Sequence, residues 1–208
     1  MPTSQSPASI PLPACDGDTV VKEGRGVSGH PDTLECDKEQ PLWLAVVYPG
    51  VLVKDVTGNG GVRRMAAGAL FRDEDGRVLL VDPTYKPTWD LPGGAVEKEE
   101  SPHAACRREV TEELGLDRPP GRVLVVDWVP SRPGRPEGLI VVYDGGVLAP
   151  GEVAAITTQD TELAGYEFVE PGEVAERVSP LLARRIAACV EAVRAGTVIS
   201  LEDGCPVT

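Results

Sequence analysis

The sequence predicts an α/β domain in which helices pack on a mixed β-sheet, preceded by an irregular N-terminal extension. Three observations support this. From residue 62 onward, short apolar segments alternate with turn residues, as in strands and hairpins. Two longer segments carry helix caps and apolar residues at helical spacing. The first forty residues are rich in proline and glycine. We therefore expect a folded domain over residues 62–208 and an extension over residues 1–61.

The extension holds few large apolar side chains in its first forty residues. Such a segment buries too little surface to offset its ordering entropy, so we expect it to be partly disordered. The apolar stretch Trp43–Val53 predicts an extra strand or a hairpin, with its turn at Pro49-Gly50. As an edge strand it would offer a surface for a homodimer. The run Thr57–Gly61 predicts a linker or a tight turn.

The expected strands begin with a hairpin. The apolar segments Val62–Arg72 and Arg77–Asp82 flank the turn sequence Asp73–Gly76. Further strands are expected over residues 123–129, 139–143 and 166–169, with a short extended segment over residues 89–91. Strands mixed with helices in this way predict a mixed sheet.

Two helices are expected, and both have recognisable ends. The first spans residues 101–114, where Ser101 suits the N-cap, Pro102 the first helical position and Gly115 the C-terminal cap. The second opens at Ser179-Pro180 and ends at Gly196. Apolar residues at helical spacing along the second helix predict a face turned toward the core.

Charge and cysteine usage limit the classes of partner. The chain has 33 acidic and 20 basic residues, a formal net charge of -13. This acidity argues against a nucleic-acid polymer as partner, because such binders are usually basic. The longest apolar run, Trp43–Tyr48, is far short of a membrane span. No secretory signal is visible, and five scattered cysteines without a CxxC pair predict free thiols in the cytoplasm.

Three glutamates gather on the first predicted helix. Glu109, Glu112 and Glu113 are spaced three and four residues apart, which places them on one face. Like charges so placed repel, and near a helix C-terminus they also oppose the macrodipole. A hard divalent cation with oxygen ligands would offset this cost. Taken alone, the three residues favour the simpler interpretation of a solvated acidic face.

The residues around these glutamates decide between the two interpretations. The pattern GX5EX7REUXEEXGU, where U is aliphatic, is filled at every position from Gly94 to Leu116. A chance match at every fixed position is very improbable. The segment resembles the Nudix box of the Nudix hydrolase family, and the preceding Trp89–Gly94 resembles the usual approach to that box. The order of strands and helices resembles the family loosely over residues 62–195, and residues 1–60 have no counterpart.

The resemblance implies an α/β/α sandwich on a mixed sheet, in which the box forms a loop–helix–loop. It implies hydrolysis of a nucleoside diphosphate linked to another moiety, with Mg²⁺ or sometimes Mn²⁺. By similarity, the metal ligands are Glu109, Glu112 and Glu113, with the backbone carbonyl of Gly94. Arg108 would pair with a box carboxylate, Glu100 or Glu112, and Glu100 would orient the loop.

The resemblance leaves the general base open, because members of the family differ in which carboxylate takes the proton. A box glutamate would be Glu112 or Glu113. The alternative is an acidic residue on a downstream loop. The segment before residues 166–169 resembles that loop, with Glu162 as the first candidate and Asp160 as the second. A plain solvated loop position is the simpler interpretation of either residue.

Several residues outside the box are candidates for substrate contacts. Arg64, Arg132 and Arg135 are expected to contact phosphates, the last two from the Pro/Gly/Arg loop at residues 130–138. A plain surface loop is the alternative there. Four aromatic residues are candidates for stacking on a base, although core packing is the simpler role of each; they are Phe71, Tyr85, Trp128 and Tyr143.

The substrate itself is not specified by the box. Pro130 and Pro133 lie near the offset that resembles ADP-ribose hydrolases, whereas no tyrosine precedes Tyr143 at the offset of dinucleoside-polyphosphate hydrolases. The NADH-type and coenzyme A motifs are absent. A nucleoside triphosphate, a nucleotide sugar or an ADP-ribose type of substrate remains. The alternatives are a non-catalytic nucleotide-sensing module and a hydrolase of a non-nucleotide diphosphate.

Overall fold

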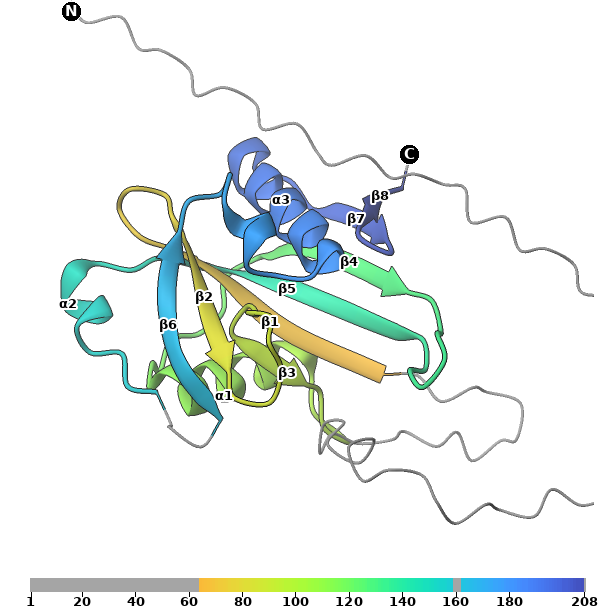
Figure 1. Cartoon of the computed structure of the whole chain (residues 1–208), viewed down its shortest axis with the longest axis horizontal. Coiled ribbons are helices and arrows are strands. Elements are labelled where there is room, and N and C mark those ends of the chain that lie inside the picture. The colour runs from red at the N-terminus through yellow and green to blue at the C-terminus, as the bar shows by residue number, and fades with distance from the viewer. Residues whose placement is uncertain (1–63, 159–161, 208) are drawn as a thin grey trace, which may run out of the picture. The chain divides into compact units, whose positions relative to one another are not determined.

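A mixed sheet of eight strands lies at the centre of the described part of the chain (Figure 1). The computed structural model describes residues 64–158 and 162–207. The strands are β1 (Arg64–Arg72), β2 (Val78–Pro83), β3 (Gly93–Ala95), β4 (Val123–Val129), β5 (Gly138–Val147), β6 (Leu163–Val169), β7 (Ile199–Glu202) and β8 (Cys205–Pro206). Their order is β6-β2-β1-β5-β4-β7-β8, and β3 also pairs with β1. β1 is parallel to β5 and β4 to β7, which confirms the mixed sheet.

Helices cover both faces of this sheet (Figure 1). On one face, α1 (Pro102–Leu114) packs Cys106 and Val110 in a cluster that includes Phe71 of β1. On the other face, α3 (Pro180–Ala195) packs Ile186 in a cluster that includes Leu70. The short α2 (Pro150–Val153) packs against the first cluster through Val153, and the 3-10 helix η2 (Val174–Glu176) contributes Val174 to the second. The arrangement is the α/β/α sandwich that the sequence led us to expect.

Both long helices have the predicted caps. The side chains of Ser101 and Ser179 each accept a hydrogen bond from a backbone N–H of the first turn, at 3.1 and 3.3 Å. The helices end at Gly115 and Gly196, which adopt left-handed φ angles of 69° and 67°. Such φ angles favour glycine, so local sequence is enough to fix these boundaries.

The structure adds elements that the sequence did not predict. They are β3, α2, η2, β7 and β8, while β5 and β6 are longer than expected. β3 has the sequence Gly-Gly-Ala, which carries no strand propensity, and it is a strand because its backbone pairs with β1. The strand predicted over residues 43–53 and the linker over residues 57–61 lie outside the described residues.

The sheet is divided along one edge of β1. Ala66, Ala67 and Gly68 pair with β3, whereas the pairing with β2 begins only at Arg72. Gly93 has a φ of 143°, and a Cβ there would lie 2.4 Å from the Ala67 carbonyl oxygen. Only glycine allows this close approach. The division leaves the outer edge of β3 open, next to the C-terminal half of α1.

A buried ion pair joins α3 to β4, and its carboxylate also binds the turn of the C-terminal hairpin. Asp127 of β4 is fully buried, and Arg185 of α3 is 7% exposed. The guanidinium Nε of Arg185 donates to Asp127 Oδ2 at 2.8 Å, and the Gly204 N–H donates to Asp127 Oδ1 at 3.0 Å. One buried carboxylate therefore connects β4, α3 and the turn between β7 and β8.

The cysteines correct one expectation from the sequence. Cys106 and Cys189 are free and buried, but Cys205 is disulfide-bonded. The prediction that all five cysteines are free thiols is therefore wrong at Cys205. Within residues 64–158 and 162–207, no helix is both long and apolar enough to cross a lipid bilayer.

Candidate functional site

The box helix turns its apolar residues to the sheet and its acidic residues to the open edge of β3. Its buried residues are Ala105, Cys106, Val110 and Leu114. The side chain of Glu109 is 17% exposed, whereas that of Glu112 is 51% exposed. The helix therefore presents one partly buried and one solvent-exposed carboxylate within a single turn.

Arg108 holds the box carboxylates in place. Its guanidinium makes a two-pronged pair with Glu100, with both N···O distances at 3.0 Å. Nη1 donates to Glu109 at 2.9 Å and to Glu112 at 3.1 Å, and Nη2 donates to the Ala95 carbonyl at 3.0 Å. The planar guanidinium suits this role because it presents several donors in a fixed geometry. Arg108 thus contacts both of the partners named from the sequence, and Glu100 ties the box loop to α1.

The backbone of two consecutive glycines, Gly93 and Gly94, lies against the carboxylates of Glu113 and Glu109. A Cβ on Gly94 would lie 2.4 Å from the Glu109 carboxylate, so the carboxylate occupies the space that a side chain would fill. The Gly93 N–H donates to Glu113 Oε2 at 2.8 Å. Glu113 therefore takes up a donor on the open edge of β3. The division of the sheet is what allows this contact.

The carboxylates crowd one another enough to shift their pKa values. Burial is the main cause that raises the pKa of Glu113 from 4.5 to about 8; the charges of Glu109, Asp90 and Glu162 act in the same direction, and the Gly93 hydrogen bond opposes the shift. Burial also raises the pKa of Glu109, although Arg108 opposes the shift. The positive charge of Arg108 alone therefore does not balance the negative charges of the box glutamates.

The donor set fits a hard divalent cation. Glu109, Glu112 and Glu113 offer carboxylate oxygens, which Mg²⁺ prefers, and the Gly94 backbone lies against Glu109. Within the described residues, no three acidic, histidine or cysteine side chains already converge on one point. The reason is visible in the contacts, since Arg108 engages Glu109 and Glu112 while Gly93 engages Glu113.

Glu162, the first downstream candidate for a general base, lies immediately before β6. Glu162 has an exposed side chain, and its carbonyl accepts hydrogen bonds from the N–H and Oγ1 of Thr84, at 2.9 and 3.2 Å. Its charge is among those that raise the pKa of Glu113, so it lies within electrostatic range of the box. Asp160 lies outside the described residues.

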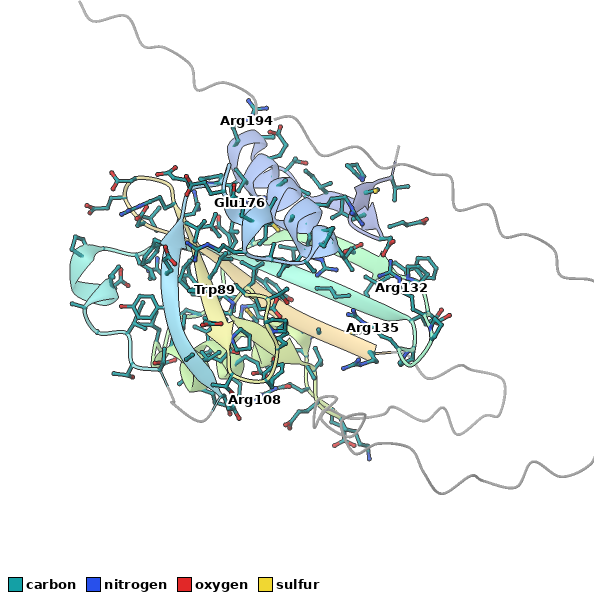
Figure 2. The ribbon with its side chains drawn as sticks, viewed as in Figure 1. Trp89, Arg108, Arg132, Arg135, Glu176 and Arg194 are labelled. Carbon is teal, nitrogen blue, oxygen red and sulfur yellow. The ribbon has the colours of Figure 1, made fainter. Side chains whose placement is uncertain are left out.

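The arginines expected to bind phosphates lie elsewhere. Arg132 pairs with Asp203 in the β7–β8 turn, at 2.6 and 2.7 Å. Arg135 lies on the same loop as Arg132, well apart from Arg108 in Figure 2. Arg64 begins β1, and alternation along the strand directs its side chain to the face that carries Leu70 and α3. The structure therefore does not gather these three arginines at the box carboxylates.

The aromatic candidates divide into buried and exposed residues. Phe71 and Tyr143 are 1% and 8% exposed and belong to the core beneath α1. Tyr85 and Trp128 are exposed. Trp89 packs against the core beneath α3, and the Arg177 guanidinium lies 5.4 Å from its ring. Trp89 therefore anchors the segment that leads to Gly93.

Sequence reasoning missed three contributions to this site. It gave no role to Gly93, whose N–H holds Glu113, nor to Asp90 and Lys86, which form an ion pair beside the box loop. Two features of the sequence could have indicated this ion pair: the position of Asp90 within the Trp89–Gly94 segment, and a lysine four residues before it. Neither signal predicts the contact, because residues 84–90 have no regular periodicity.

The pH dependence of stability provides a first prediction. Folded Glu113 keeps its proton up to about pH 8, whereas the unfolded carboxyl has a pKa of 4.5. Between these values the folded state binds more protons, so stability falls as pH rises. In EDTA, we expect Glu113 to contribute a loss approaching about 1.4 kcal/mol per pH unit within that window. Urea unfolding of the wild type and of Glu113→Gln from pH 4.5 to 8.5 measures this. Parallel pH curves for the two proteins would contradict it.

Comparison with known proteins agrees with this geometry. A family model described as the NUDIX domain matches residues 62–189. A MutT-like protein of Streptomyces ambofaciens is 29% identical over 138 residues, covering 66% of this chain and 82% of that protein. Diphosphoinositol polyphosphate phosphohydrolase 2 of Rattus norvegicus is 46% identical over 66 residues, which is 31% of this chain and 37% of that protein. The crystal structure of a MutT protein from Methanosarcina mazei Go1 superposes with a TM-score of 0.52 at 24% identity, covering 64% of this chain and 95% of that one.

Proposed function

Because the chain belongs to the NUDIX family of hydrolases, we propose that it is a divalent-metal-dependent pyrophosphohydrolase acting on a nucleoside diphosphate linked to another moiety. The observation that carries this proposal is the complete set of box carboxylates at the open edge of β3, ordered by Arg108 and by the Gly93 N–H. A nucleotide sugar, an ADP-ribose type of compound and a nucleoside triphosphate are the substrate classes that we propose.

Each box residue has a separate role in this proposal. Glu109, Glu112 and Glu113 would hold Mg²⁺, or alternatively Mn²⁺, together with the Gly94 carbonyl. When bound, the ion neutralises phosphate oxygens and lowers the pKa of a coordinated water. Arg108 fixes the orientation of the carboxylates, and Glu100 fixes Arg108. The net charge of -13 does not oppose a diphosphate substrate once cations occupy this acidic site.

A carboxylate is proposed to take the proton from the attacking water. Glu112 and Glu113 are the candidates on the helix, and Glu162 is the candidate on the segment before β6. Glu162 is exposed and is not engaged by Arg108, which favours a role apart from metal binding. The pH–rate profiles of Glu112→Gln, Glu113→Gln and Glu162→Gln identify the base. It is the residue whose substitution abolishes the fall in rate at low pH.

The substrate is tested by direct turnover. The purified full chain is incubated with MgCl₂ and a panel of nucleoside triphosphates, UDP-sugars and ADP-ribose, and nucleoside monophosphate and phosphate are quantified. We expect release from at least one nucleotide and none in excess EDTA. Absence of release from every compound would contradict the proposal. A cytoplasmic location and a homodimer stay predictions, as does the absence of a nucleic-acid partner.

A non-nucleotide diphosphate is the second candidate. It is favoured by the 46% identity, over 66 residues, to a protein named a diphosphoinositol polyphosphate phosphohydrolase. The match covers only 37% of that protein, so the likeness supports the chemistry of a diphosphate and not a particular substrate. Adding a diphosphoinositol polyphosphate to the same panel separates the two candidates.

The positioning role of Arg108 gives a second prediction. A lysine keeps the charge but cannot hold Glu100 with two parallel hydrogen bonds while reaching Glu109. We expect Arg108→Lys to lower kcat about 10- to 100-fold, as loss of an outer partner of a metal ligand does. Arg107→Lys is the matched control, because neighbouring Arg107 pairs with Asp117 on the exposed side. Equal activities of the two variants would contradict this role.

A further inference from the structure

A pocket of about 380 Å³ lies away from the box, between the β1–β2 turn, β6 and the segment that contains α2. In Figure 1, α2 and the β1–β2 turn lie on the left of the view, beside β6. None of the residues that line the pocket belongs to the box. Asp73 of the turn follows Ala67, the partner of Gly94, by six residues, which is about 20 Å along a strand. The pocket is therefore a separate site.

One wall of the pocket is apolar and aromatic. Leu148 is buried, and Tyr166 and Phe168 of β6 are half-buried. The two rings stand at 90° to each other, with their centroids 6.4 Å apart. The face of an aromatic ring carries negative charge density and attracts cations. Two perpendicular rings therefore provide two sides of a cage that suits an ammonium group.

The β1–β2 turn gives the pocket a net negative charge. Three carboxylates and one guanidinium line it, namely Asp73, Glu74, Asp75 and Arg77. Arg77 pairs with both aspartates, at 2.7 Å to Asp73 and 3.4 Å to Asp75. Among the described residues, no ion pair engages Glu74. The Glu74 carboxylate is thus available to a cation in the pocket.

The walls of the pocket are held by hydrogen bonds. The Tyr166 hydroxyl of β6 donates to the Val153 carbonyl of α2 at 3.3 Å. In the turn, Asp73 Oδ1 accepts the N–H groups of Asp75 and Arg77, at 3.1 and 2.9 Å. A ligand would therefore meet a pocket that is already formed, and little of its binding energy would be spent on ordering the protein.

From this geometry we propose that the pocket binds a small organic cation that carries an ammonium group on an apolar body. The ammonium lies against the rings of Tyr166 and Phe168 and pairs with Glu74, while the apolar body packs on Leu148. The volume falls within the range of about 300–1,000 Å³ that is usual for small-molecule sites. This inference goes beyond the proposed hydrolysis and does not depend on it, because the pocket contains no box residue. The competing explanation is a surface hollow that accepts any apolar compound.

The test titrates 2-phenylethylammonium into the ¹⁵N-labelled full chain in EDTA at pH 7, followed by amide chemical shifts. We expect shifts in residues 73–77 and in β6, with a Kd of about 1 mM or lower. The neutral 2-phenylethanol has the same apolar body and should bind at least about tenfold more weakly, because it lacks the charge that the rings and Glu74 attract. Phenylacetate carries the opposite charge and should not shift these amides.

Two variants assign the binding to the pocket. Glu74→Gln should raise the Kd of the ammonium compound about 3- to 5-fold and leave that of the alcohol unchanged. Phe168→Leu keeps an apolar side chain but removes the ring, and it should raise the Kd about 3- to 10-fold. Glu202→Gln is the matched control for Glu74→Gln, because Glu202 is exposed on β7, on the side of the sheet away from β6.

Three results would overturn the inference. The first is the absence of shifts in the wild type, or shifts confined to α1 and β3, which would place the cation at the box glutamates. The second is equal affinity for the ammonium compound and the alcohol, which would show a plain apolar hollow. The third is the same Kd for Glu74→Gln and Glu202→Gln. Failure of the nucleotide panel would contradict the proposed hydrolysis and leave this site unaffected.

Discussion

Glu109→Gln is expected to lower kcat/KM for the substrate identified in the panel by about a thousandfold or more. A metal ion contributes several kcal/mol to the stabilisation of the transition state, and about 1.4 kcal/mol corresponds to a factor of ten. Glu109 is the critical ligand candidate, because its carboxylate lies against Gly94 and contacts Arg108. Glutamine keeps the shape of the side chain but removes the negative charge that a cation requires.

Two measurements accompany this prediction. The affinity for Mn²⁺, followed by electron paramagnetic resonance, should fall in Glu109→Gln, while the thermal midpoint should not fall. The stability is expected to be maintained because burial already disfavours the charged form of Glu109. Glu99→Gln is the matched control, since Glu99 lies in the box loop with its side chain 84% exposed. A kcat/KM within tenfold of wild type would contradict a role for Glu109 in metal binding.

Asp127→Asn is expected to give the largest loss of stability, about 3–5 kcal/mol, because it leaves the charge of Arg185 buried without its partner. The carboxylate also accepts the Gly204 N–H, so the C-terminal hairpin should loosen as well. Guanidinium unfolding at pH 7 measures the free energy. Loosening of the hairpin should appear as faster hydrogen exchange of the β7 and β8 amides.

The design includes two comparisons. Replacing both Asp127 and Arg185 with leucine should cost less than Asp127→Asn, because no charge is then left unpaired. Glu191→Gln breaks the exposed pair with Arg194, at 2.6 Å, and should change stability by less than about 1 kcal/mol. A similar small loss for Asp127→Asn and Glu191→Gln would show that burial of the first pair has no energetic consequence.

The sequence predicted those parts of the site in which spacing along the chain alone brings residues together. The box pattern identified Glu109, Glu112 and Glu113 as neighbours, because residues three and four apart share a helix face. It was uninformative about the phosphate contacts. Arg132 was a reasonable candidate by loop position, but Asp203, 71 residues away, engages it in the folded chain. No periodicity in the sequence encodes a partner at that separation.

By itself, the sequence determined the local features of this protein. The ends of α1 and α3 followed from a serine cap, a proline and a left-handed glycine, and the β1–β2 hairpin followed from its turn. Tertiary structure alone decided the division of the sheet at β1, the pairing of β3 and the hold of Gly93 on Glu113. Local features depend on the conformational preferences of adjacent residues. The others depend on backbone groups and charges brought together from distant segments, where packing of the whole sheet decides which donors remain open.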